Sequence, residues 1–131
     1  MACKIVTFGN FKGGTGKTTN SCMIAYELSK LKKKVLLVDL DPQANATSLL
    51  LQTRQGQKKE VMAYDSTLMK AITDNTLELI VTDINDYLDL LPSFADFSSY
   101  PLFLEGKFKL QKDRIFYLRN LLAPLKLIMI T

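Results

Sequence analysis

Lys12-Gly13-Gly14-Thr15-Gly16-Lys17-Thr18-Thr19 is the stretch that decides the fold of this 131-residue chain. It follows the apolar residues 5–8 and precedes a segment with helical periodicity that extends to about Leu31. A strand, a glycine-rich turn and a helix in this order form the context of a phosphate-binding loop. Glycines let successive backbone N–H groups point at a polyphosphate, and the helix adds the positive end of its dipole. In such a loop Lys17 would bring charge to the β- and γ-phosphates, and the hydroxyl of Thr18 would ligate Mg²⁺.

The loop departs from the general phosphate-loop pattern at its first glycine. Phe11 stands at that place, and a second lysine, Lys12, occurs inside the loop instead. The alternative interpretation is a flexible glycine turn with solvated lysines. We favour phosphate binding because a predicted strand and a predicted helix flank the loop.

A second informative stretch, residues 39–47, directly follows the apolar run at residues 35–38. Ligand sites in parallel sheets collect at the carboxyl ends of the strands. We expect Asp39 and Asp41 to have different roles, and Pro42 to keep Asp41 out of helical geometry and to fix a turn. The alternative is a turn after a strand that happens to be acidic.

Length and composition predict one domain over residues 1–131, with 47% hydrophobic and 23% charged residues and a core of modest size. No apolar run is long enough to span a bilayer and no signal-peptide pattern is present, so we expect a cytoplasmic protein without a membrane partner. The two cysteines lack metal-ligand spacing, and the lack of histidine excludes His-based catalysis and His-ligated zinc. The formal charge is +4, with four lysines at residues 30–34. We expect these lysines to be solvated at a helix end rather than to form a DNA-binding patch.

Apolar patterns predict strands at residues 4–8, 35–38, 88–91 and 127–130, and helices at 17–31, 66–72 and 114–122. The first two strands should form a parallel pair with a right-handed connection. We expect the first helix to pack on the sheet with Ile24, Ala25, Leu28 and Leu31, and residues 52–60 to form an exposed loop. The aromatic-rich residues 94–111 are interpreted as core or helix-packing surface, with base stacking as the alternative.

Residues 11–20 and 35–47 together resemble the ParA-type (Soj-like) partition ATPases, members of the ParA/MinD superfamily with a deviant Walker A loop. The similarity is dense over residues 4–51. The Asp-Leu-Asp-Pro-Gln segment favours the ParA branch over MinD, and the lack of a suitable cysteine pair disfavours the nitrogenase iron protein. The resemblance implies an α/β, P-loop NTPase-like parallel sheet flanked by helices. It also implies that residues 1–131 are the N-terminal half of such a domain.

The resemblance further implies an ATP- and Mg²⁺-dependent switch. Nucleotide would be held by Lys12, Gly13, Gly14, Thr15, Gly16, Lys17, Thr18 and Thr19. Lys12 would reach across an ATP-dependent homodimer to the partner's nucleotide, Asp41 would orient the attacking water, and Thr18 and Asp41 would lie at the metal. In the family the dimer binds DNA non-specifically on the nucleoid, and a centromere-binding ParB-like protein stimulates hydrolysis during plasmid or chromosome segregation.

The family's second acidic motif, Asp-x-Pro-Pro, does not occur in the 131 residues. A second hypothesis is therefore a truncated, non-catalytic nucleotide-binding fragment that is inert or interferes with intact relatives. We expect such a chain to retain nucleotide binding and to hydrolyse ATP poorly. A single-base deletion within the codons of residues 126–131 would explain it as a frameshifted remnant. For one A/T-rich choice of codons, restoring one A gives Lys-Ile-Asn-Tyr-Asp-Tyr, and Tyr-Asp-Tyr or a close variant is common in the family at this place. A genuine early end is the alternative, and the DNA sequence distinguishes the two.

Overall fold

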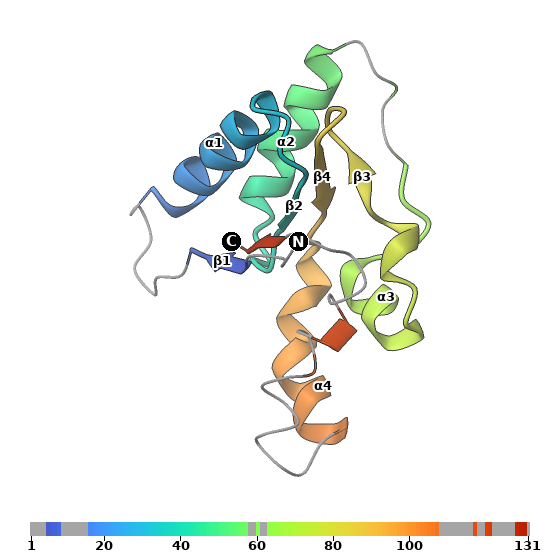
Figure 1. Ribbon diagram of the computed structural model, residues 1–131. Coiled ribbons are helices and arrows are strands. Elements are labelled where there is room, and N and C mark those ends of the chain that lie inside the picture. Colours follow the sequence, from blue (N-terminus) through green and yellow to red (C-terminus); the bar gives the residue numbers. More distant parts are fainter. Residues whose placement is uncertain are drawn as a thin grey trace.

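The computed structural model describes residues 5–8, 16–57, 60, 63–107, 117, 120–121 and 128–130. The described residues form a sheet with helices on both faces (Figure 1). Its strands are β1 (Ile5–Thr7), β2 (Val35–Val38), β3 (Thr82–Asp83), β4 (Leu88–Leu91) and β5 (Ile128–Ile130). The α-helices are α1 (Lys17–Lys30), α2 (Asn45–Gly56), α3 (Leu68–Asp74) and α4 (Tyr100–Lys107), with short 3₁₀ helices η1 (Leu77–Leu79) and η2 (Ala95–Ser99).

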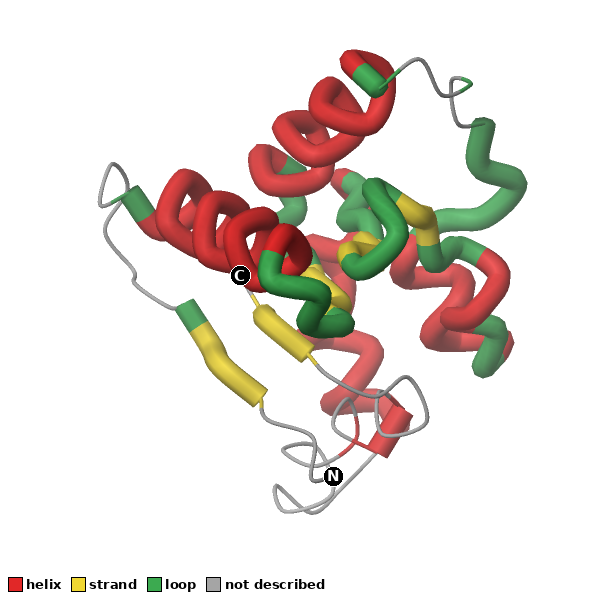
Figure 2. The backbone as a smooth tube through the Cα atoms, turned by 45° about the horizontal axis from the view of Figure 1, so that its top comes forward, coloured by secondary structure: helices red, strands yellow, loops and turns green. Residues whose placement is uncertain are grey.

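The strand order is β1-β5-β2-β4-β3, and all neighbouring pairs are parallel except β3 with β4. The prediction that the first two strands pair directly is wrong, although they do run parallel. β5 lies between them, with Met129 opposite both Val6 and Leu37 (Figure 2). A short strand of three apolar residues suits this interior position, because parallel strands covered on both faces are apolar throughout. The antiparallel edge strand β3 was not predicted, and it makes the sheet mixed.

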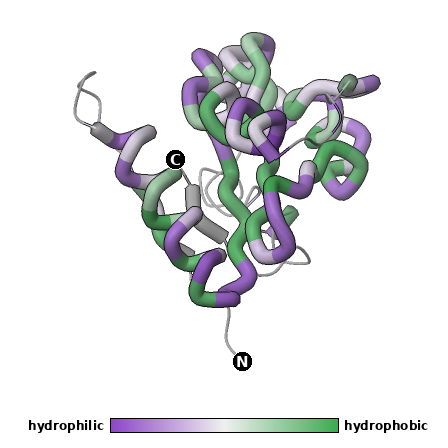
Figure 3. Tube along the Cα trace, turned by 90° about the horizontal axis from the view of Figure 1, so that it is seen from above, coloured by the Kyte–Doolittle hydropathy of each residue, from purple (hydrophilic) through white to green (hydrophobic). Residues whose placement is uncertain are grey.

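Strand β2 divides its side chains between two hydrophobic cores, one on each face of the sheet. Val35 and Leu37 pack with residues of α1 and α2, including Ala25 and Leu50. On the other face Leu36 and Val38 pack with residues of α3, η1 and η2. The alternation follows from the period of two in a strand, and Figure 3 shows the hydrophobic strand segments between the helices. The predicted α/β class with helices flanking a sheet is confirmed.

The orientation of α1 differs from the expectation. Its buried residues are Ser21, Cys22, Ala25 and Ser29. Ile24 is 44% exposed and Leu31 70% exposed, so of the predicted packing face only Ala25 is buried and Leu28 half-buried. Small side chains let the helix backbone approach the sheet closely, and the Ser29 hydroxyl is satisfied by the carbonyl of Tyr26 at 2.6 Å. The packing face of α1 that was predicted from hydrophobicity alone is therefore wrong for Ile24 and Leu31.

The loop predicted at residues 52–60 is also wrong over its first half, because α2 continues to Gly56. Arg54 is buried there and helps to attach the helix to β3. The predicted short helix after Ser66 is confirmed as α3. The Thr67 side chain caps it by accepting a hydrogen bond from the amide of Lys70, and Asn75 ends it in a left-handed conformation.

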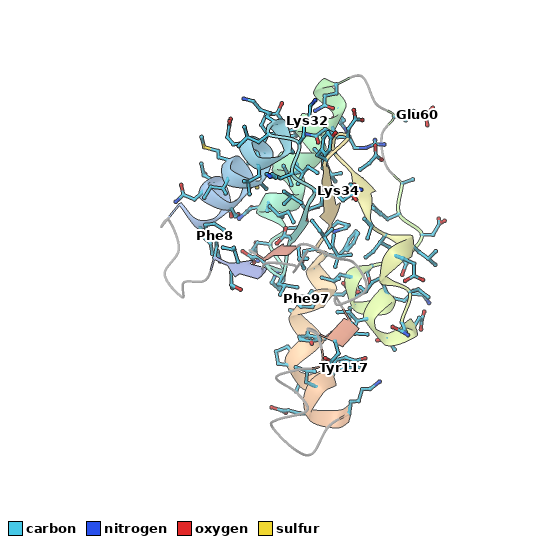
Figure 4. The ribbon with its side chains drawn as sticks, viewed as in Figure 1. Phe8, Lys32, Lys34, Glu60, Phe97 and Tyr117 are labelled. Carbon is cyan, nitrogen blue, oxygen red and sulfur yellow. The ribbon has the colours of Figure 1, made fainter. Side chains whose placement is uncertain are left out.

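Aromatic residues of the 94–107 segment pack against one another and against the sheet. Phe97 stacks on Tyr100 at 4.9 Å, and Tyr100 stacks on Phe103 at 6.2 Å between ring centroids. Phe103 lies 6.0 Å from Tyr117, and Figure 4 shows Phe97 and Tyr117 beside α4. These contacts confirm the packing interpretation for the described aromatic residues. Phe108 and most of the helix predicted at residues 114–122 lie outside the described residues.

Candidate nucleotide site

The four leading residues of the predicted phosphate loop, Lys12, Gly13, Gly14 and Thr15, lie outside the described residues. Gly16 is the first described residue of the loop, and its φ of 77° lies in the left-handed region. A side chain is strained in that conformation, which explains the need for glycine. The Gly16 carbonyl accepts the first helical hydrogen bond from the amide of Asn20 at 2.9 Å, so α1 begins directly after the loop.

The first turn of α1 carries Lys17, Thr18 and Thr19 and contains no acidic residue. No side chain of Gly16 can cap this end, and the structure shows no side-chain hydrogen bond there. Lys17 and Thr18 are half-buried, whereas Thr19 is exposed. The first amides of a helix have no partner within it, so this end combines N–H groups that lack an intrahelical acceptor, the positive dipole end and a lysine. Such an arrangement favours an anion.

The acidic turn follows β2 at the same edge of the sheet. Because β1 and β2 both run parallel to β5, and β4 runs parallel to β2, Phe8, Asp39 and Pro92 all follow the carboxyl ends of strands at one edge of the sheet. The carbonyl of Asp41 accepts a hydrogen bond from the amide of Ala44 at 2.8 Å, which closes the turn that Pro42 was predicted to fix. The loop helix and this turn therefore start from the same edge.

Asp39 and Asp41 lie in different environments. Asp39 is fully buried, and its carboxylate accepts hydrogen bonds from the amide of Asp41 and from the amide and hydroxyl of Thr47. Burial raises the pKa of the Asp39 carboxyl above its ordinary range, and the hydrogen bonds from Thr47 and Asp41 oppose that rise. Asp41 is half-buried, and its carboxylate accepts from the amide of Gln43 at 3.0 Å. The carboxylate of Asp41 is thus accessible, and that of Asp39 is not.

Cys22 belongs to the same hydrophobic core as Leu37 of β2 and Ala46 of α2. It lies on the second turn of α1 and is 3% exposed. Burial raises the pKa of its thiol to about 11; a hydrogen bond with Ser21 lowers this pKa, and the negative charge of Asp39 raises it further. The negative charge of Asp39 therefore acts on the Cys22 thiol of α1, one turn after Lys17 and Thr18.

The residues present fit a nucleotide with its magnesium ion. Mg²⁺ prefers oxygen ligands, and the Thr18 hydroxyl and the accessible Asp41 carboxylate are both oxygen donors. Within the described residues no group of three His, Cys, Asp or Glu side chains could hold a metal by itself. A metal here would therefore need the phosphates as further ligands, as is usual for Mg²⁺ with nucleotides.

Sequence reasoning missed two residues of this edge, Thr47 and Ser93. The Thr47 hydroxyl accepts a hydrogen bond from the amide of Ser93 at 2.9 Å, which links the start of α2 to the end of β4. A signal was available, because Ser93 follows a predicted strand and Thr47 closes the acidic stretch. The rule that the carboxyl ends of parallel strands meet at one edge would have brought them together.

The lysine run at residues 30–34 lies at the other end of α1, where Figure 4 shows Lys32 and Lys34 far from Phe8. Its side chains are exposed, and Lys30 forms an ion pair with Glu27 at 3.1 Å. They are solvated as expected. None of the described helices has the length and apolar character needed to cross a membrane.

Comparison with known proteins identifies the family. A family model described as an AAA domain matches residues 3–127. The chromosome-partitioning ATPase Soj of Treponema pallidum is 34% identical over 123 residues, which cover 94% of this chain and 44% of that protein. A plasmid partition protein of Borrelia burgdorferi, solved with bound AMPPNP, superposes with a TM-score of 0.71 at 26% identity over 99% of this chain and 53% of its own.

A more distant structure shows the same fold. The cobyrinic acid a,c-diamide synthase of Mycobacterium smegmatis, solved with ADP and magnesium, has a TM-score of 0.79 at 24% identity over 98% of this chain and 50% of its own. The chain spans 33%, 44% and 40% of the length of three curated relatives that it matches, and so corresponds to less than half of each. The match of the family model to nearly the whole chain and the similarity to partition proteins show that the chain belongs to the ParA/Soj-type family of partition ATPases.

Proposed function

We propose that this chain binds ATP with Mg²⁺ at the start of α1 and acts as a nucleotide-dependent switch in plasmid or chromosome segregation. One observation carries the proposal: the left-handed Gly16 begins α1 at the sheet edge from which the acidic turn after β2 also starts, and this N-terminus has no side-chain cap and carries Lys17 and Thr18. The Borrelia burgdorferi relative with bound AMPPNP supports a nucleotide as the ligand.

Each residue of the loop would have a separate task. Residues 12–16 and the amides of Lys17, Thr18 and Thr19 would surround the phosphates, and Lys17 would neutralise the terminal ones. Thr18 would ligate Mg²⁺, with Asp41 nearby. The metal supplies charge neutralisation on the phosphates, and phosphoryl transfer depends mainly on positioning and such electrostatic stabilisation.

Hydrolysis would depend on Asp41 and Lys12. The accessible carboxylate of Asp41 would orient the attacking water, and Lys12 would reach the nucleotide of a second copy in an ATP-dependent homodimer. The dimer would be cytoplasmic and would bind the DNA of the nucleoid non-specifically. A centromere-binding ParB-like protein would stimulate hydrolysis. The similarity to the chromosome-partitioning ATPase Soj supports this cycle.

A second candidate function is nucleotide binding without efficient turnover. The observation that favours it is the lack of an Asp-x-Pro-Pro motif in the 131 residues. In that case the chain would be inert or would interfere with intact relatives by occupying their dimer surface.

Turnover and dimerisation distinguish the two functions. The switch predicts Mg²⁺-dependent phosphate release by the purified 131-residue chain and an increase in mass with ATP, measured by light scattering. Lys12→Ala should remove both effects while the monomer still binds ATP, and Lys34→Ala, which removes an exposed lysine far from the loop, should preserve both. Binding without turnover or mass change would favour the second function, and loss of affinity in Lys12→Ala would contradict its action across the dimer.

A further inference from the structure

The buried carboxylate of Asp39 connects three elements at the carboxyl edge of the sheet. Its Oδ1 accepts a hydrogen bond from the amide of Asp41 at 3.0 Å. Its Oδ2 accepts from the amide of Thr47 at 2.9 Å and from the Thr47 hydroxyl at 2.7 Å. The Asp39 amide donates to the carbonyl of Leu91 at 3.1 Å, so its own main chain is attached to β4. A fully buried side chain with three donors is held in one orientation.

Asp39 also acts as a cap for α2 from outside the helix. The residue at the capping position is Ala44, whose methyl group cannot accept a hydrogen bond. The amide of Thr47, the third residue of the helix, donates to Asp39 instead. This carboxylate meets the positive end of the helix dipole and satisfies one of the first amides, as a local capping residue would. The start of α2 is therefore fixed relative to β2.

The hydroxyl of Thr47 extends the connection to β4. It donates its single proton to Asp39 and accepts a hydrogen bond from the amide of Ser93 at 2.9 Å. All three groups are buried. The ends of β2 and β4 and the start of α2 are thus joined through one carboxylate and one hydroxyl.

Asp41 depends on this arrangement for its own position. Its side chain is half-buried, and the hydrogen bond that it receives from Gln43 comes from within the same short turn. The turn that carries Asp41 is fixed on both sides. The Asp41 amide donates to Oδ1 of Asp39, and the start of α2, which follows the turn, is capped by Oδ2 of Asp39. We propose that Asp39, supported by Thr47, is a positioning residue that sets the place of the Asp41 carboxylate relative to the phosphate loop. This inference rests on the proposed function for its catalytic consequence, but its structural part is independent of it.

The first test measures the position of the Asp41 main chain in the nucleotide-free, full 131-residue chain. Hydrogen exchange of the Asp41 amide is compared in wild type, Asp39→Asn, Thr47→Val, Thr47→Ser and Thr53→Val. Thr53 is the matched control, because it lies on the same helix and, among the described residues, its hydroxyl donates to the helix carbonyl of Leu49. Asparagine keeps the shape of Asp39, but its side chain has one accepting oxygen and one donating NH₂ group. It therefore cannot accept hydrogen bonds at both positions that the two carboxylate oxygens occupy.

We expect exchange of the Asp41 amide to accelerate about tenfold or more in Asp39→Asn, as for a lost hydrogen bond to a charged group. The acceleration should be smaller in Thr47→Val, and exchange should stay near wild type in Thr47→Ser and Thr53→Val. Amides of β2 and β4 report global stability. The proposal would be overturned if, in Asp39→Asn, exchange of the Asp41 amide accelerated no more than exchange of the β2 and β4 amides. It would also be overturned if exchange of the Asp41 amide did not change.

The second test measures catalytic consequence in the same variants. Thr47→Val should lower the rate of ATP turnover at saturation about tenfold while leaving KM within about twofold, and Thr47→Ser should restore the rate. If Asp39 and Thr47 served only to cap the helix, the turnover rate would not fall selectively while KM stayed the same. That result would contradict the positioning role. If the wild-type chain binds ATP but does not turn it over, the switch proposal fails, while the exchange measurement still decides whether Asp39 positions Asp41.

Discussion

The guanidinium group of Arg54, on α2, donates from Nε to the carbonyl oxygen of Asp83, on β3, at 2.8 Å. It also donates from Nη1 to the carbonyl of Glu60, and Nη2 lies 3.5 Å from a carboxylate oxygen of Asp83. The side chain is only 10% exposed. One buried arginine therefore connects the last turns of α2 to the edge strand and to the segment that follows the helix.

Arg54→Ala should lower the free energy of unfolding by about 1–3 kcal/mol, because it removes the charged donors that bind the carbonyls of Asp83 and Glu60 and empties the space of the buried aliphatic stem. Urea denaturation measures the change. Gln55→Ala, on the exposed side of the same helix, is the control and should change stability by less than about 0.5 kcal/mol. Equal effects of the two substitutions would show that Arg54 contributes nothing beyond helix propensity.

The orientation of α1 predicts opposite results for two of its apolar residues. Ala25→Leu should destabilise the fold by about 1–3 kcal/mol, because Ala25 is fully buried against the sheet and a larger side chain overfills the contact. Leu31→Gln should stay within about 0.5 kcal/mol, because Leu31 is largely exposed. Thermal or urea unfolding of both variants checks this, and the reverse order would restore the packing face predicted from the sequence.

The thiol of Cys22 should be unreactive in the folded chain. Its pKa is raised to about 11 from an ordinary value of 9.0, so the thiolate fraction near pH 8 falls roughly a hundredfold. In a Cys3→Ser background, alkylation by iodoacetamide should be slower by at least that factor than in urea. Comparable rates in the two states would mean that Cys22 is not buried in solution.

The same shift of the Cys22 pKa gives a pH dependence of stability. The folded-state pKa lies above the unfolded value, so the unfolded chain releases this proton first as the pH rises. The contribution is complete below about pH 9 and is lost progressively between about pH 9 and 11. Denaturation of Cys22→Ser over this range should lack that part of the decline, whereas an identical decline would assign it to other groups.

Asp41→Ala should separate binding from turnover. ATP affinity should remain within about threefold, and the hydrolysis rate should fall by about 10² or more, as for a lost water-positioning group. Nucleotide titration and phosphate release measure the two quantities, with Asp65→Ala as a control at an exposed acid in another turn. If affinity collapses together with turnover, Asp41 is principally a metal-site residue.

Local patterns predicted β1, β2, β4, β5, α1 and α3, but not α2, α4 or β3. The apolar runs at residues 35–38 and 88–91 are β2 and β4, and the Thr67 cap marks the start of α3. These signals are local, because periodicity and capping depend on neighbours in the chain. The strand order is not local: β5 lies between β1 and β2 although it comes last in the sequence, and no property of residues 5–38 alone requires it.

The packing of α1 and the partners of Asp39 could not be read from hydrophobicity. Ser21 and Ser29 are buried because their hydroxyls bond to carbonyls one turn back, which removes the cost of burying them. Asp39 is buried because Thr47, eight residues away, satisfies it. The sequence marked the acidic turn as important, but only the structure shows that one acid supports the other.

The central claim is that residues 12–19 hold a nucleotide, and calorimetric titration of the 131-residue chain with MgATP tests it most directly. Hydrogen bonds to charged groups contribute about 1.5–3 kcal/mol, so loss of the lysine should weaken binding roughly tenfold to a hundredfold. The account predicts one ATP per chain, this loss in Lys17→Ala, and affinity within about twofold of wild type in Lys34→Ala. No detectable binding by the wild-type chain, or equal affinity in Lys17→Ala and Lys34→Ala, would contradict it.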